Sequence, residues 1–88
     1  MNNQQYPDFE TDAYTHFLVG EFGEAERLYR RALIRAEMQY GSGHLRVAEA
    51  LEELVRVLEA EGKNKEALAA RERAMDIVSH CHSVMRGS

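Results

Sequence analysis

The feature that most constrains the fold of this chain is an internal repeat, in which residues recur at the distance that separates Gly20 from Gly62. At that spacing Glu24 aligns with Glu66, Ala25 with Ala67, Arg31 with Arg73, Ala32 with Ala74 and Leu33 with Met75. A repeating unit of this size is typical of stacked helical arrays, in which each unit packs only against its neighbours. The repeat therefore predicts two copies of one helix-turn-helix unit.

Glycines mark the three places where helices should end. Gly20 and Gly23 flank the first break, Gly41 and Gly43 flank the second, and Gly62 marks the third. Glycine is favoured just past a helix C-terminus because it adopts a positive φ without strain. We therefore expect an all-α fold with four antiparallel helices, over about residues 8–19, 22–40, 44–61 and 64–84.

The third segment has the clearest helical pattern, because its apolar residues share one face of a helix and its charged residues share the other. The apolar set is Val47, Ala48, Leu51, Leu54, Val55 and Leu58, and the charged set is Glu49, Glu52, Glu53, Arg56 and Glu59. We divide the chain into an N-terminal extension (1–7), a first repeat (8–40), a second repeat with an extended last helix (41–86) and a tail (87–88).

Several stretches resemble the tetratricopeptide repeat family, and in particular its longer-repeat branch typified by kinesin light chain. The first stretch is GEFGEAERLYRRAL at 20–33, and the second is GKNKEA at 62–67 with RAM at 73–75. The connector YGSGH at 40–44 is similar to the loop between repeats of that branch. The resemblance spans nearly the whole chain and implies two tandem helical hairpins, in which the repeated alanines let helices approach closely.

The resemblance also implies a protein-binding adaptor or scaffold, because the first helix of each repeat lines a concave binding face in this family. The residues that it places on this face are Glu10, Tyr14 and Phe17 in the first unit and Glu49, Glu52, Glu53, Arg56 and Glu59 in the second. An acidic face with an aromatic end would accept a basic or amphipathic segment of a partner. The alternative is a solvated charged helix face, since such faces are common.

The chain departs from the family pattern at some positions. Phe9 and Leu51 stand near the start of each unit, where the family has tryptophan. Glu52 and Glu53 correspond to asparagines that hold the ligand in kinesin light chain. Other members bind the carboxylate tail of chaperones through lysine, arginine and asparagine at these positions, so the glutamates here disfavour that activity.

Composition excludes several classes of function. A formal net charge of −4 gives no basic surface for nucleic acid or an anionic membrane, and no apolar run is long enough to span a bilayer. The single cysteine, Cys81, excludes an internal disulfide and fits a reducing compartment, so we expect a cytoplasmic protein. We expect neither a cofactor nor an enzyme. Nucleophilic catalysis by Cys81 would need an oriented histidine in a pocket that excludes water, and four short helices offer little room for one. No phosphate-binding glycine loop or metalloprotease motif occurs.

A different class of function would use His80, Cys81 and His82 as a metal- or redox-responsive site. Adjacent residues of a helix point about 100° apart, and no second ligand pair has the spacing of a zinc site. We therefore predict no metal site and expect Cys81 to pack among the apolar residues of the last helical segment. The metal- or redox-responsive protein stays as the alternative interpretation.

The last segment carries more apolar residues than one neighbouring hairpin can cover. They include Leu68, Met75, Ile77, Val78, Cys81, Val84 and Met85. Helical arrays usually need about three or more units and a polar cap, whereas this chain shows two. We therefore expect a homodimer about a two-fold axis, with Ile77, Val78, Cys81 and Val84 at or near the contact. The alternative is that the last helix folds back or docks a different protein. A third interpretation is that the chain is a fragment of a longer array.

Overall fold

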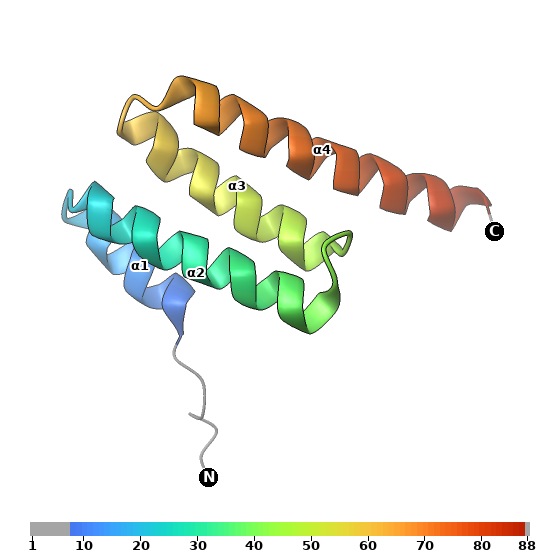
Figure 1. Ribbon diagram of the computed structural model, residues 1–88, viewed down its shortest axis with the longest axis horizontal. Helices are drawn as coiled ribbons and strands as arrows, with labels where there is room; N and C mark the ends of the chain where they lie inside the picture. Colours follow the sequence, from blue (N-terminus) through green and yellow to red (C-terminus); the bar gives the residue numbers. More distant parts are fainter. Residues whose placement is uncertain (1–7, 88) are drawn as a thin grey trace, which may run out of the picture.

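The computed structural model describes residues 8–87, with side chains described for residues 8–82. The helices are α1 (Phe9–Leu18), α2 (Phe22–Tyr40), α3 (Leu45–Ala60) and α4 (Asn64–Gly87). Each helix packs against the next one in the chain, and α2 and α4 lie on opposite sides of α3 (Figure 1). The all-α fold and the two tandem helical hairpins, α1–α2 and α3–α4, are therefore confirmed.

The two hairpins reverse direction by the same hydrogen-bonded turn. Gly20 has a φ of 87° and Gly62 a φ of 78°, a conformation that strains any residue with a Cβ atom. In the first turn the Gly20 N–H donates to the Phe17 carbonyl and the Glu21 N–H donates to the His16 carbonyl, over 3.1 and 2.8 Å. The second turn repeats both bonds at the equivalent positions, over 3.0 and 2.8 Å. This pair of bonds satisfies carbonyls that a helix end leaves open, so the repeated glycines have a structural cause.

The first helix of each hairpin begins with a side chain that caps it. Asp8 accepts a hydrogen bond through its Oδ1 atom from the Thr11 N–H, over 3.1 Å. His44 accepts one through its Nδ1 atom from the Arg46 N–H, over 3.0 Å. Such caps satisfy backbone donors that the first turn of a helix leaves unpaired, and an aspartate cap such as Asp8 stabilises its helix by about 1 kcal/mol.

The core is centred on α3, which is buried on two sides because α2 and α4 both pack against it. A larger core cluster comprises Ala13, Ala25, Leu28, Tyr29, Leu54, Val55, Val57, Leu58 and Ala67. A smaller core cluster comprises Val47, Ala48, Leu51, Ala74 and Ile77. Ala50 and Val57 are also buried, although the pattern of α3 predicted only one apolar face. The second neighbour of α3 explains this difference.

Helix α4 uses only part of its apolar stripe against α3. Ala67, Ala74 and Ile77 are buried, whereas Leu68 and Met75 are more than half exposed. Because α4 lies at the edge of the structure, no described element covers its other side (Figure 1). In the part of the chain that the structure describes, no helix is both long and apolar enough to cross a bilayer.

Candidate functional site

The fold brings side chains of α1 and α3 together above α2. Tyr29 of α2 is buried between the two helices, and the charges of Glu53, Arg56 and Glu10 all act on its hydroxyl. Burial, followed by the charge of Glu53, raises the pKa of Tyr29. Tyr14 lies near the same hydroxyl and is half exposed. We call this surface the α1–α3 face and define it by Glu10, Tyr14, Glu49, Glu53 and Arg56.

The carboxyl groups of Glu10 and Glu53 meet at the centre of the α1–α3 face. Burial raises the pKa of Glu53 to about 7, the charges of Glu10 and Glu49 act in the same direction, and Arg56 opposes them. The Oε1 atom of Glu53 is enclosed and has no hydrogen-bond partner among the described residues. Glu53 therefore changes its protonation state near neutral pH.

We predict that the protonation of Glu53 links stability to pH. A pKa raised above that of the unfolded chain means that the folded state binds this proton more tightly, so stability falls as pH rises from about 4.5 through 7. Glu53→Gln should therefore stabilise the fold at about pH 8, by about 1 kcal/mol once solvent screening is allowed for, and have little effect at about pH 5. Thermal unfolding followed by circular dichroism at both pH values measures the difference. The exposed neighbour provides the control, as Glu52→Gln should show no such contrast, and an equal effect of Glu53→Gln at both pH values would contradict the prediction.

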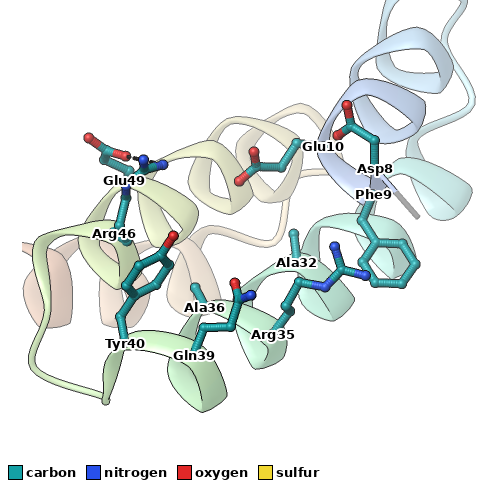
Figure 2. A pocket seen from close by; sticks show the side chains of 10 residues that line it. All are labelled: Asp8, Phe9, Glu10, Ala32, Arg35, Ala36, Gln39, Tyr40, Arg46 and Glu49. Carbon is teal, nitrogen blue, oxygen red and sulfur yellow. Dashed lines mark ion pairs between the residues drawn. The ribbon is translucent and has the colours of Figure 1, made fainter. Parts of the chain in front are cut away.

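A pocket of about 170 Å³ opens at the end of the α1–α3 face nearest the start of both helices. Figure 2 shows Glu10 of α1 and the Arg46–Glu49 ion pair of α3 above a floor that includes Ala32 and Ala36 of α2. The small alanine side chains leave the space open. The remaining lining residues are Asp8, Phe9, Arg35, Gln39 and Tyr40. The pocket therefore combines both signs of charge with aromatic rings and could hold one side chain of a bound segment.

A wider, more open hollow of about 400 Å³ lies toward the other end of α3. Its lining consists of Glu52, Val55, Arg56, Glu59 and Arg71. Arg71 reaches across from α4 and forms an ion pair with Glu59. Glu52 is exposed and forms no ion pair among the described residues. The charges at this end are therefore partly balanced, rather than uniformly acidic.

The structure places most of the predicted face residues together, but not all of them in the same way. Glu10, Tyr14, Glu49, Glu53 and Arg56 form the centre of the face, and Glu52 and Glu59 lie toward its far end. Phe17 is placed differently, because its ring is half-buried and packs against Phe22 at a centroid distance of 5.4 Å. Its ring belongs to the core of the first hairpin, since the short α1 turns it inward.

The sequence did not identify three further residues at or beside the face. Tyr29 forms the buried floor, whereas the family resemblance places only residues of the first helix of each repeat on the face. Arg46 and Arg71 supply positive charge, from the first turn of α3 and from α4. The spacing of Arg71 on α4 carries no signal for this role, because only the packing of α4 against α3 brings it beside Glu59.

The segment His80, Cys81 and His82 forms no ligand cluster in the structure. The Cys81 thiol donates a weak hydrogen bond to the Gly43 carbonyl, at 3.5 Å, and both histidines are exposed. Within the described residues, no three side chains of histidine, cysteine, aspartate or glutamate are placed to hold a metal ion. The alternative interpretation as a metal- or redox-responsive protein therefore gains no support.

The residues predicted for self-association take different positions. Ile77 is buried in the smaller core cluster, and Cys81 packs against that cluster, because both face α3. Val78 is 43% exposed. Val84 belongs to α4 but lies outside the residues whose side chains the structure describes. An intermolecular contact through α4 would therefore use the outer side of the helix rather than Ile77.

Comparison with known proteins identifies one family. A model for the tetratricopeptide repeat matches residues 13–79, which include most of α1, all of α2 and α3, and most of α4. No curated protein and no solved structure gives a significant match to the chain.

Proposed function

The chain belongs to the tetratricopeptide repeat family, and from this we propose that it is a non-catalytic module that binds a basic or amphipathic segment of another protein along the α1–α3 face. Members of this family generally bind protein partners. The observation that carries the proposal is the row of carboxylates Glu10, Glu53 and Glu52, because none of them forms an ion pair with lysine or arginine among the described residues. A cationic ligand could therefore form ion pairs with them.

The chemistry of the face supports a cationic, partly apolar ligand. Lysine or arginine of the ligand would meet the Glu10 and Glu53 carboxyls, and a positive charge there favours release of the proton from Glu53. Tyr14 is half exposed and offers a ring face for an apolar side chain or a cation. The pocket above Ala32 and Ala36 lies next to Glu10 and could take an anchoring side chain. Because Glu53 loses its proton as the pH rises, binding of a cationic ligand should strengthen from about pH 6 to 8.

Reversal of two charges on the face tests the proposal. The probe is an immobilised set of lysine-rich amphipathic peptides, with the same peptides carrying glutamate in place of lysine as negative controls. We expect the native protein to bind only the lysine forms, and Glu52→Lys with Glu53→Lys to weaken binding at least about tenfold. Native binding should also weaken between about 50 and 300 mM salt, since the contacts are largely exposed charges.

The control carries the same change of net charge at a different place. Glu72→Lys with Asp76→Lys lies on α4, away from the α1–α3 face, and should leave peptide binding unchanged when it is measured at protein concentrations at which the native chain is monomeric. If both double variants weaken binding equally, the attraction is general and the face is not the site. If neither the native protein nor its variants distinguish lysine from glutamate peptides, the charged face is only solvated.

We also propose that the protein self-associates, because α4 presents an apolar surface to solvent. Leu68 is 56% exposed, Met75 60% and Val78 43%, and all three lie on the side of α4 that α3 does not cover. Exposed apolar residues that share one side of a helix favour a partner. A location in the cytoplasm remains a prediction from the single cysteine.

A further inference from the structure

The contact between the two hairpins shows which residues join one repeat to the next. Leu33 and Ala36 of α2 pack against the second hairpin, where they contact the smaller core cluster. Two ion pairs flank this contact, Arg30 with Glu66 at 2.9 Å and Arg73 with Glu37 at 2.7 Å. The contact between the hairpins therefore combines an apolar centre with ion pairs of opposite charge beside it.

The edge formed by α4 has the features of the α2 surface that receives α3. In the repeat, Met75 corresponds to Leu33 and Val78 to Ala36, and both of these α4 residues are exposed. Glu72 and Asp76 lie on the outer part of the same helix and form no ion pair among the described residues. We call this surface the α4 edge. It is an apolar stripe with carboxylates along one side.

The opposite edge of the structure is a groove with the complementary charge. The groove has a volume of about 390 Å³ and is lined by Phe9, Arg31, Ile34, Arg35, Met38 and Gln39. Ile34 and Met38 are 54% and 81% exposed. The Arg31 guanidinium lies over the Phe9 ring, 5.0 Å from its centroid, so the groove is apolar with a basic rim.

This groove faces away from the second hairpin. Ile34 and Ala36 are two residues apart, so their side chains are separated by about 200° around the helix axis. Because Ala36 packs toward the second hairpin, Ile34 lies on the opposite side of α2. Figure 1 shows α1 and α2 at one side of the flat structure and α4 at the other. We call the groove the α2 edge. The two unpartnered apolar surfaces therefore lie at opposite sides of the molecule.

We propose that copies of this chain associate head to tail, with the α4 edge of one copy seated on the α2 edge of the next. This proposal rests on the self-association proposed above and names its surfaces. Leu68, Met75 and Val78 would cover Ile34 and Met38, and Glu72 and Asp76 would lie toward Arg31. Opposite charges across such a contact select this pairing. A head-to-tail contact does not close on itself in a dimer, so it extends to longer assemblies.

A two-fold contact between two α4 helices is disfavoured by the same charges. It would bring Glu72 and Asp76 of both copies to one seam, where like charges repel. Arg71 offers little compensation, because it already forms an ion pair with Glu59. The basic rim that could neutralise these carboxylates lies on the α2 edge.

Two variants that each block one edge distinguish the arrangements. Met38→Glu adds a charge to the α2 edge and Met75→Glu adds one to the α4 edge, and both positions are exposed, so folding should be preserved. By sedimentation equilibrium, the native protein should exceed the dimer mass as concentration rises, and each variant alone should be monomeric. An equimolar mixture of the two variants should form a dimer, because one intact edge of each kind remains. Leu45→Glu, at an exposed site on the first turn of α3, is the matched control and should assemble like the native protein.

Other outcomes would overturn the proposal in distinguishable ways. A native assembly that stops at the dimer, is lost with Met75→Glu and is unchanged by Met38→Glu would show a two-fold contact through α4. Self-association would then stand, but the head-to-tail arrangement would not. A folded native protein that stays monomeric would remove self-association altogether, and peptide binding by the α1–α3 face would be unaffected. A mixture that stays monomeric would also contradict the proposal.

Discussion

Leu54→Ala should remove about 2–5 kcal/mol of folding stability, and this is the largest effect that we expect from a single substitution. Leu54 is 2% exposed and belongs to the larger core cluster. Its removal from α3 leaves a cavity between helices that pack on both sides, so neighbouring side chains cannot easily fill the space. A domain of this length has about 4–13 kcal/mol of stability in total, so the variant should lose a large share of its stability.

Chemical denaturation followed by circular dichroism measures this loss. The control is Leu45→Ala, which removes the same atoms from the same helix at a site that is 42% exposed, and it should cost less than about 0.5 kcal/mol. Equal losses for the two variants would mean that α3 is not the centre of the core.

Ala74→Leu should cost about 1–3 kcal/mol or more by overpacking, because Ala74 is fully buried in the smaller core cluster. The repeat makes Ala32 its equivalent in α2, and the sequence alone predicts the same cost for Ala32→Leu. The structure distinguishes the two positions. Ala32 lines the pocket of about 170 Å³ at the end of the α1–α3 face, so part of a leucine side chain can enter that space. We therefore expect Ala32→Leu to cost less than Ala74→Leu.

The same denaturation experiment compares the two variants directly. Ala69→Leu, at an exposed position on α4, is the control for leucine in a helix and should be nearly neutral. A neutral result for Ala74→Leu would show that the helices do not approach closely at the repeated alanines. Equal costs for Ala32→Leu and Ala74→Leu would show that the pocket does not accept added atoms.

The helices and their reversals were predictable because their causes are local. A period of 3.6 residues in the apolar positions identifies a helix, and a positive φ at Gly20 and Gly62 is needed whatever surrounds the turn. The two copies of the pattern confirm each other, so the fold class and the four helices follow from the sequence. Observed helix ends differ from the predicted ends by at most three residues.

The candidate site was only partly predictable, because its residues come from helices that are distant in the sequence. The meeting of Glu10 with Glu53 follows from the likeness of the two repeats, which places both residues on first helices. The raised pKa of Glu53 does not follow from it, since burial by the packed helices is its main cause. The approach of Arg71 to Glu59 likewise depends on how the helices pack.

The sequence by itself determined that α4 is an apolar, repeat-related helix, and only the tertiary structure decided which of its residues are buried. Ala67, Ala74 and Ile77 face α3, while Leu68 and Met75 face solvent. A helix with a broad apolar stripe can meet its neighbour in more than one rotation, each burying a similar amount of apolar surface. The small alanines allow the closest approach to α3, and this packing turns the larger residues outward.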